Sequence, residues 1–328
     1  MALMLAYRLK KEGYFPIVYG LSEAVCKKHM LERVIDLDQV PENIFACVIG
    51  GGAFLQNESG PFVRMLEKFI SWVNTSNIPV LAISIGGDGD YSFIRGGESD
   101  TCNDRVLSLL RTCDSWVGIT VRLEGEVTKF DEFTGLDCRY YPDIVLCANT
   151  FLSEKQPKKS RHIVVSANNN LKNKLFFWFA SVFVALQKYH VKYLATHLPD
   201  SPYYKKDLSG WSGAQCAYLD PFEFLRVISD SNVLVSNKLH VGVSAISCGV
   251  PFVSYAGKPK TKAFMKEAGL SDFCVPKKEP AKLISILSRV DDNVIIPYND
   301  IHFSRIQDLS EKAEGHFTFL LEKLQKLD

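Results

Sequence analysis

Short apolar runs alternate with longer amphipathic stretches along the 328 residues of this chain. The runs are rich in β-branched residues and end at glycine or polar residues, which is typical of strands buried in a parallel sheet. They predict strands over residues 17–20, 45–49, 80–85, 116–120, 139–145, 163–167, 192–196, 215–219, 233–235 and 252–255. Apolar residues at helical spacing predict helices over residues 1–11, 61–74, 104–113, 173–190, 221–230, 281–290 and 303–327, with a further helix opening at 121–124. This alternation predicts an α/β protein built from right-handed βαβ units.

The length suits two domains of about 150 residues each. We predict an N-terminal domain over residues 1–150, a polar linker over 151–161 and a C-terminal domain over 162–300. The last stretch, residues 301–328, is amphipathic, and by analogy with other two-domain folds we expect it to pack back on the N-terminal domain.

The composition narrows the classes of partner and compartment. The formal net charge is +1 and hydrophobic residues make up 47% of the chain, so neither nucleic acid nor a membrane surface is expected as a partner. The nine cysteines are scattered without a Cys-x-x-Cys pair, which argues against a metal or redox site and fits reduced thiols in the cytoplasm. The longest apolar run, residues 175–186, is too short to cross a membrane, and the first residues do not predict a signal peptide.

Residues 232–264 form the most informative stretch of the chain. Strand 233–235 leads into a turn that carries Lys238 and His240, and an apolar helix follows. Strand 252–255 leads into a second turn, which carries Lys258, Lys260 and Lys262. In a parallel sheet both strand ends lie at the carboxyl edge, where ligands bind, and the free N–H groups at a helix start favour an anion. This stretch therefore predicts a site for a phosphate or a carboxylate.

Two glycine-rich strand ends, Gly50-Gly51-Gly52 and Gly86-Gly87-Asp88-Gly89, would let the backbone approach a ligand closely. Neither forms the dinucleotide-binding fingerprint or a phosphate loop, and the packing of tight turns explains them as well. The candidates for substrate binding in these stretches are Gly51, Gly52, Gly86, Gly87 and Asp88.

Other polar residues follow predicted strands. Arg122 comes after strand 116–120, where a solvated charge is the simpler interpretation. His197 ends strand 192–196, and a parallel sheet would place it on the same rim as His240. Asn168 could bond sugar hydroxyls, although the run Asn168-Asn169-Asn170 also favours a turn. Asp220 before Pro221 is typical of a helix N-cap.

The stretch from 221 to 270 resembles the C-terminal signature of the polysaccharide pyruvyl transferases, and a weaker resemblance extends over nearly the whole chain. The residues that carry it are Lys238-Leu239-His240, Ala245, Gly249-Val250-Pro251, Tyr255 and Gly269-Leu270. The family usually has Arg-Leu-His where this chain has Lys238, and lysine offers a point charge in place of a two-pronged fork. Arg122 fits a Ser-x-Arg-Asp/Glu-like element of the family, here written Thr120-Val121-Arg122-Leu123-Glu124 with Leu123 as an extra spacer.

The resemblance implies two Rossmann-like domains that face a cleft, a GT-B-like fold, with the acceptor on the N-terminal side and the donor on the C-terminal side. It implies transfer of pyruvate from phosphoenolpyruvate to two hydroxyls of a sugar, which forms a ketal on a polysaccharide or its precursor without cofactor or metal. His240 and Arg122 are the implied catalytic groups. The implied donor ligands are Lys238, Lys258, Lys260, Arg122 and Tyr255.

Pyruvyl transferases open with a strand and a glycine-rich turn before the first helix, and this chain opens with the helix. A late start site, a fragment and a family member without this segment are all open explanations. The acceptor sugar could be linked to a nucleotide, a lipid or a polymer, and the sequence does not identify it or the oligomeric state.

Two alternatives from other classes remain at this point. The first is a nucleotide-sugar glycosyltransferase of the same architecture, which also needs cations for its diphosphate. The second is a non-catalytic relative that binds a glycan or a partner protein, which the missing first strand and Lys238 would favour.

Overall fold

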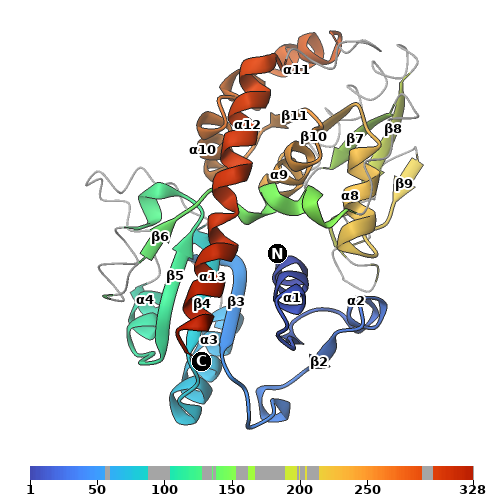
Figure 1. The fold of residues 1–328 in the computed structure, drawn as a ribbon. Helices are drawn as coiled ribbons and strands as arrows, with labels where there is room; N and C mark the ends of the chain where they lie inside the picture. The colour runs from blue at the N-terminus through green and yellow to red at the C-terminus, as the bar shows by residue number, and fades with distance from the viewer. Residues whose placement is uncertain are drawn as a thin grey trace. The chain divides into compact units, whose positions relative to one another are not determined.

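The computed structural model describes residues 1–55, 60–87, 104–127, 135, 138–152, 162–166, 189–197, 199, 204, 214–289 and 298–327. The chain divides into two compact units (Figure 1). Unit 1 comprises Met1–Ile144 and Glu311–Asp328, and unit 2 comprises Val145–Ser310. Every strand pairing in both units is parallel among the described residues, so the predicted α/β class with two Rossmann-like units is confirmed.

Unit 1 contains two parallel sheets. The larger has the order β3 (Cys47–Leu55), β4 (Val80–Gly87), β5 (Trp116–Val121) and β6 (Cys138–Tyr140). The strands β1 (Ile17–Tyr19) and β2 (Glu32–Val34) form a separate pair. The accompanying helices are α1 (Ala2–Lys11), α2 (Glu23–Lys28), α3 (Gly60–Ser76) and α4 (Asp104–Arg111). That a first strand is missing from this unit stays a prediction.

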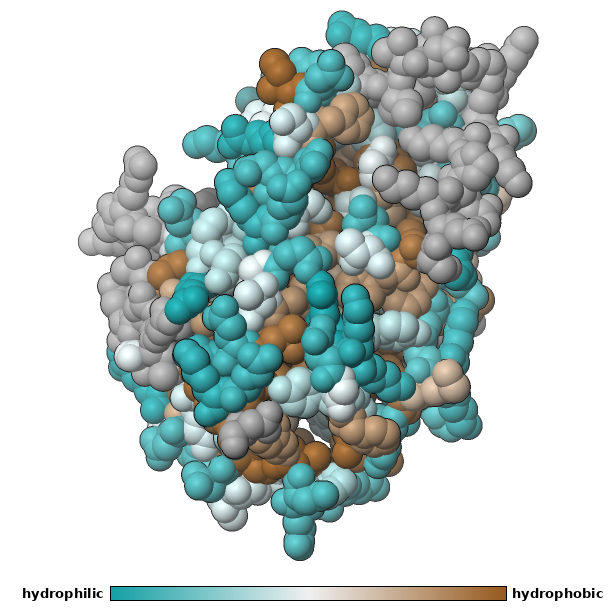
Figure 2. All heavy atoms as spheres, in the orientation of Figure 1, coloured by the Kyte–Doolittle hydropathy of each residue, from teal (hydrophilic) through white to brown (hydrophobic). Residues whose placement is uncertain are grey.

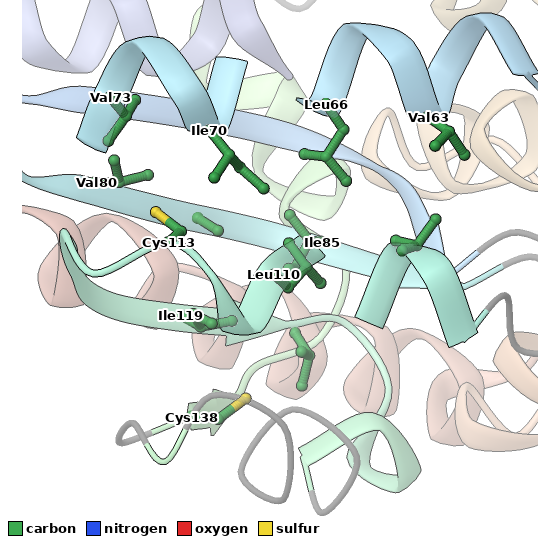
Figure 3. Close-up of a cluster of buried hydrophobic side chains, with 13 residues drawn as sticks. Val63, Leu66, Ile70, Val73, Val80, Ile85, Leu110, Cys113, Ile119 and Cys138 are labelled. Carbon is green, nitrogen blue, oxygen red and sulfur yellow. The ribbon is translucent and has the colours of Figure 1, made fainter. Parts of the chain in front are cut away.

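The core of unit 1 lies between its larger sheet and the helices α3 and α4 (Figure 3). Helix α3 contributes Val63, Leu66, Ile70 and Val73 at spacings of three and four residues, which places them on one face. Burial of one such side chain contributes about 1.5–3 kcal/mol. The α3 helix therefore forms because this stripe packs on β4, where Val80 is also fully buried.

The C-terminal helix α13 (Gly315–Gln325) packs against β4 and β5. Strand β5 directs Ile119 and Val121 toward the core described above, so Gly118 and Thr120 face α13. A Cβ at Gly118 would come within 2.6 Å of the Phe319 ring, and the glycine therefore lets the helix approach closely. The single helix predicted over 303–327 is wrong, because α12 (Asp300–Ala313) and α13 are separate helices with the break at Glu314.

Unit 2 has one six-stranded sheet. Its order is β12 (Cys274–Val275), β11 (Phe252–Tyr255), β10 (Val233–Ser236), β7 (His162–Ser166), β8 (His190–Leu194) and β9 (Ala214–Cys216). The chain proceeds from β7 outward to β9, and β10 then pairs with the other side of β7 and begins the opposite half. Ligands of open α/β sheets bind beyond the carboxyl ends of the strands at such a switch point.

Four helices of unit 2 are α8 (Pro221–Ser229), α9 (Leu239–Ser247), α10 (Pro259–Glu267) and α11 (Pro280–Leu287). Asp220 is the predicted N-cap of α8, and its Oδ1 accepts hydrogen bonds from the backbone nitrogens of Phe222 at 2.9 Å and Glu223 at 3.1 Å. Gly242 lets α9 rest on β11, because a Cβ at this position would overlap the Phe252 ring.

Some predicted boundaries differ from the structure. The strand predicted over 139–145 ends at Tyr140, because Pro142 has no N–H to donate to a ladder, and Ile144–Phe151 forms a 3-10 helix. The helix expected to open at 121–124 is a short 3-10 turn over Glu124–Glu126. The helix predicted over 173–190 lies outside the described residues except at its end, where His190 begins β8.

Hydrophilic residues cover much of the described surface on the face shown in Figure 2, with smaller hydrophobic patches between them. The most exposed large apolar side chains are Met30, Phe15, Ile301 and Ile35. Across the ranges that the structure describes, no helix combines the length and the apolar content needed to cross a membrane.

Candidate functional site

A row of serines marks the carboxyl edge of the unit 2 sheet. Ser236 of β10 pairs in register with Ser166 of β7 and with Ser254 of β11. All three are buried, and side chains in the same register of a parallel sheet point to the same face. The sequence contains a signal for this row, because a serine lies at or next to the end of three apolar runs, and the row was not predicted.

Lys238 is held at this edge by two hydrogen bonds. Its backbone nitrogen donates to the Ser236 hydroxyl at 3.0 Å, and its ammonium donates to the hydroxyl of Thr196. Thr196 follows β8, and β7 lies between β8 and β10, so the Lys238 side chain reaches across the end of β7. His197, the next residue after Thr196, is half-buried at the same strand end, and the structure thus brings Lys238 to the segment that carries His197.

His240 lies in the first turn of α9 and is partly exposed. Its backbone carbonyl accepts a hydrogen bond from the Ser244 hydroxyl at 2.7 Å, which fixes the first turn of the helix. Lys238 is the N-cap of this helix and provides no side-chain cap, so the first backbone N–H groups of α9 are not covered by a capping side chain.

Helix α10 repeats this arrangement after β11. Lys258 is its N-cap without a side-chain cap, Pro259 is its first residue, and Lys260 follows. Lys258 is exposed and Lys260 is half-buried. The preceding Ala256 has φ +54, a left-handed conformation that costs about 1–3 kcal/mol for a residue with a side chain.

The charged side chains from β10 to the start of α10 have one sign. The sequence has no aspartate or glutamate between Asp230 and Glu267, and the lysines at the strand ends and helix starts of this stretch are Lys238, Lys258, Lys260 and Lys262. Two helix N-termini add partial positive charge at the same strand ends. This arrangement can hold a small, multiply charged anion.

Tyr255, the fourth predicted donor ligand of unit 2, lies in the core. It is 3% exposed, and its hydroxyl donates a hydrogen bond to the Lys277 carbonyl at 3.0 Å. Burial raises the pKa of this phenol. The contact ties β11 to the segment that follows β12, and the donor contact expected of Tyr255 stays a prediction.

In unit 1, the glycines predicted to end a strand lie within β3, which continues to Leu55, and they serve packing in part. Gly51 has φ +69, and a Cβ there would overlap the Met1 side chain, while a Cβ at Gly50 would come within 2.8 Å of Leu5. Gly52 is also left-handed, with φ +118. Gly86 and Gly87 end β4 and are buried.

Arg122 follows β5 and is only 2% exposed, so the simpler interpretation of a solvated charge is wrong. Its backbone nitrogen donates to the Ile85 carbonyl at 3.2 Å, and its Nη2 donates to the Gly87 carbonyl at 3.4 Å. A buried guanidinium requires polar partners or an anion, because the cost of burying an isolated charge is large. Arg122 and the Gly86–Gly87 strand end therefore form one local structure at the carboxyl edge of unit 1.

A buried polar network lies beneath Arg122. The Thr120 hydroxyl and His316 Nδ1 are 2.7 Å apart, and His316 Nε2 lies 3.0 Å from the Pro142 carbonyl. Burial lowers the pKa of His316 to about 4, although the nearby Asp143 carboxylate raises it. His316 has no distinguishing signal in the sequence, because its partner Thr120 is 196 residues away and its own helix has an ordinary amphipathic pattern.

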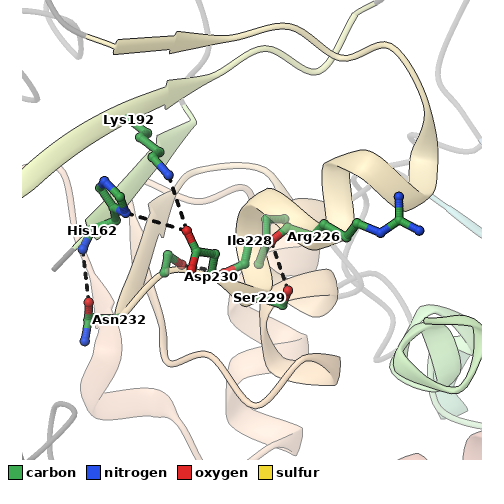
Figure 4. Close-up of polar contacts among 8 residues, drawn as sticks. His162, Lys192, Arg226, Ile228, Ser229, Asp230 and Asn232 are labelled. Carbon is green, nitrogen blue, oxygen red and sulfur yellow. Dashed lines mark hydrogen bonds and ion pairs between the residues drawn. The ribbon is translucent and has the colours of Figure 1, made fainter. Parts of the chain in front are cut away.

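A second charged cluster lies at the opposite, amino end of the unit 2 sheet (Figure 4). The Asp230 carboxylate is 3.7 Å from His162 Nδ1 and 3.4 Å from Lys192 Nζ. Asn232 joins this end of the sheet by accepting a hydrogen bond from the His162 backbone nitrogen at 3.1 Å. Burial and the Lys192 ammonium lower the pKa of His162, and Asp230 opposes them. This cluster lies at the amino ends of the strands, and it is therefore separate from the carboxyl edge, where α/β sheets bind ligands.

Two of the predicted substrate-binding residues, Asp88 and Asn168, lie outside the described residues. Within the described ranges, no group of three or more His, Cys, Asp or Glu side chains could hold a metal ion. The cysteines in these ranges are all free.

Comparisons with known proteins agree with this architecture. The family model described as polysaccharide pyruvyl transferase matches residues 5–259 of the chain. No curated protein sequence matches it.

Similar solved structures share the fold at low sequence identity. The structure of MnaA from S. aureus with UDP has a TM-score of 0.62 and 12% identity. The match covers 97% of this chain and 92% of the MnaA chain. UDP-GlcNAc 2-epimerase from Methanocaldococcus jannaschii has a TM-score of 0.57 and 11% identity, and the match covers 97% of this chain and 95% of the epimerase. CalG4, the calicheamicin glycosyltransferase, has a TM-score of 0.52 and 13% identity, and the match covers 99% of this chain and 94% of CalG4.

Proposed function

Because the chain belongs to the polysaccharide pyruvyl transferase family, we propose that it transfers pyruvate from phosphoenolpyruvate to two hydroxyls of a sugar and forms a cyclic ketal. The observation that carries this proposal is the carboxyl edge of unit 2, where Lys238 and the starts of α9 and α10 form a cationic rim in a stretch that has no carboxylate between Asp230 and Glu267. Phosphoenolpyruvate carries a phosphate and a carboxylate, and its site needs several fixed positive charges.

Three cations of this edge would bind the donor. Lys238 is the most firmly positioned, because Thr196 and Ser236 fix its two ends. Lys258 and Lys260 lie at the start of α10, where the helix dipole adds to their charge. The Ser166 and Thr261 hydroxyls are buried without a hydrogen-bond partner among the described residues, and a bound anion would be a suitable partner for them. Arg122 is the corresponding anion ligand of unit 1.

The chemistry requires proton movement at three atoms, the two sugar hydroxyl oxygens and the methylene carbon. The first sugar hydroxyl adds to the central carbon of the enol, loses its proton, and the methylene carbon gains one and becomes a methyl group. The second hydroxyl then adds to the same carbon, its proton is removed, and phosphate leaves as the ketal closes. We assign these transfers to His240, which is partly exposed and lies two residues after Lys238. Histidine can both accept and donate a proton near neutral pH.

The acceptor is a sugar linked to a nucleotide, a lipid or a polymer. We place the reaction in the cytoplasm, because the free thiols of the described cysteines suit a reducing compartment.

One observation favours a second candidate, a nucleotide-sugar transferase. MnaA, which has a similar fold, was solved with UDP. Against this candidate, a ribose is commonly held by a carboxylate, and none occurs between Asp230 and Glu267. A non-catalytic relative remains the third candidate, since Lys238 replaces the usual arginine of the family signature.

Calorimetry with phosphoenolpyruvate and with UDP, followed by an assay of phosphate release, tests the proposal. The acceptor panel would hold lipid-linked and simple galactosides, glucosides and mannosamines. We expect phosphoenolpyruvate to bind, Lys238→Ala to weaken it, and His240→Ala to bind it without turnover. His190→Ala is the matched control, because His190 is exposed at the amino end of the same sheet. Binding of UDP without phosphoenolpyruvate would favour the nucleotide-sugar candidate, and full turnover by His240→Ala would contradict the role of His240.

A further inference from the structure

Strand β4 contains a bulge at a residue with unusual backbone geometry. Ser84 is fully buried and has φ +56, in the left-handed region that residues with a side chain avoid. Ala82 pairs with Ile119 and Ile85 pairs with Val121, so three steps along β4 (82 to 85) face two along β5 (119 to 121). Bulges of this kind re-aim the strand that follows them and are frequent next to active sites.

Side chains from β5 and α13 hold this bulge. The Ser84 backbone nitrogen donates to the Thr120 hydroxyl at 2.9 Å, and the Ser84 hydroxyl accepts from the Ile144 nitrogen at 3.3 Å. The Pro142 carbonyl can only accept, so His316 carries its proton on Nε2. The unprotonated Nδ1 then accepts a hydrogen bond from the Thr120 hydroxyl. The oxygen of this hydroxyl in turn accepts the hydrogen bond from the Ser84 backbone nitrogen.

The end of β4 beyond the bulge accepts the hydrogen bonds of Arg122, which follows β5. The carbonyls of Ile85 and Gly87, one and three residues beyond Ser84, accept the hydrogen bonds from the Arg122 backbone and side chain. We propose that His316, acting through Thr120 and Ser84, is a positioning residue that sets the orientation of Arg122 for the anionic donor. The role of Arg122 toward the donor rests on the proposed function, whereas the mechanical link from His316 to Arg122 does not.

Packing alone does not require an imidazole here. Helix α13 already buries Phe317, Phe319 and Leu320 to within 1% exposure. A buried imidazole and hydroxyl would be costly unless every polar atom had a partner, and a fully satisfied buried network fixes one geometry. A hydrogen-bonded histidine at position 316 is therefore better explained by the geometry of the β4 bulge that it fixes than by the packing of α13 on the sheet.

Thr120→Val is the sharpest test, because valine keeps the shape and removes only the hydroxyl. Thr120→Ser keeps the hydroxyl and is the conservative rescue. Val73→Ala is the stability control, since Val73 is fully buried in unit 1 and belongs to the core cluster on the other face of β5. Arg122→Lys, alone and combined with Thr120→Val, reports whether the two residues act together.

We expect Thr120→Val to weaken phosphoenolpyruvate binding roughly 10- to 100-fold, with Thr120→Ser close to wild type. In the Arg122→Lys background, Thr120→Val should add little. We also expect Thr120→Val to show faster amide hydrogen exchange at residues 85–87 and 122 than Val73→Ala does. The two variants are compared under conditions in which their melting temperatures are equal. If Thr120→Val does not fold, His316→Leu, which removes the acceptor of the Thr120 hydroxyl, replaces it in the same comparisons.

The two readouts separate the two claims. Additive effects of Thr120→Val and Arg122→Lys, or hydrogen exchange equal to that of Val73→Ala, would overturn the positioning role. If the wild-type protein binds no phosphoenolpyruvate, the proposed function fails, and the exchange rates at residues 85–87 and 122 still decide whether His316 positions Arg122.

Discussion

Acidification should destabilise unit 1 through His316. This imidazole is fully buried, and burial lowers its pKa to about 4 from an ordinary value of about 6.5. The unfolded chain therefore binds a proton more tightly than the folded chain does between these two values. Stability is complete above pH 6.5, falls as the pH drops from 6.5 toward 4, and falls no further from this cause below pH 4.

The magnitude follows from the difference between the two pKa values. At about 1.36 kcal/mol per pH unit, the loss comes to about 3 kcal/mol. Several groups face the imidazole and contribute to its pKa. The Asp143 carboxylate and the carbonyls of Tyr141 and Pro142 favour the protonated form, and desolvation outweighs them. The Tyr141 ring packs against it at 5.3 Å, and the Met1 amino group faces Asp143.

Urea denaturation followed by hydrogen exchange of β4 and β5 peptides measures the stability of unit 1 by itself. The comparison is between wild type and His316→Gln at pH 7, 6, 5 and 4. Glutamine does not titrate, so we expect the difference in unfolding free energy between the two proteins to change by about 3 kcal/mol over this range. His162 also has a lowered pKa, but it occurs in both proteins and cancels. Parallel pH profiles for the two proteins would refute the reasoning.

Three further outcomes are expected. Gly242→Ala should destabilise unit 2 by about 1–3 kcal/mol in urea denaturation, because the added Cβ overlaps the Phe252 ring in a packed core; unchanged stability would show that α9 can shift freely. Lys192→Met should raise the pKa of His162 in an NMR titration, since it removes a repelling cation and leaves Asp230 in place; a lower pKa would contradict the cluster described above. Cys47 should react slowly with thiol reagents at neutral pH, because burial raises its pKa to about 11; labelling as fast as that of a free thiol would exclude this environment.

The fold could be predicted from local patterns because each element has its own periodicity. The strand at 233–235, the apolar helix after Lys238 and the strand at 252–255 all occur within a residue or two of the predicted positions. The cap at Asp220 was equally local, since aspartate before proline has one favourable use at a helix start.

The features that the sequence did not predict depend on distant residues. The Thr120–His316 pair joins segments 196 residues apart, and neither residue is unusual within its own element. Ser84 adopts a left-handed backbone at a place where Thr120 and Ile144 bind its polar atoms. Tyr255 lies in a strand in which every residue is buried, so the alternation of side chains gave no indication of which face its ring would take.

Arg122 illustrates both sides of this difference. Its position after a strand was predicted correctly, and the resemblance to a known family marked it as a candidate. Its burial was not predicted, because the carbonyls of Ile85 and Gly87 that bind it come from the neighbouring strand. A charge that looks solvated in sequence can be held in the interior when a neighbouring strand presents carbonyls that accept its hydrogen bonds.

The most direct test of the central claim is the mass of the acceptor after incubation with phosphoenolpyruvate. The purified protein would be incubated with each sugar of the panel, and the products analysed by mass spectrometry alongside His240→Ala and the His190→Ala control. We predict that one class of acceptor gains the mass of pyruvic acid less one water, with one phosphate released for each ketal formed, and that only His240→Ala loses this product. An acceptor that gains a glycosyl mass from a nucleotide sugar, and none from phosphoenolpyruvate, would contradict the account.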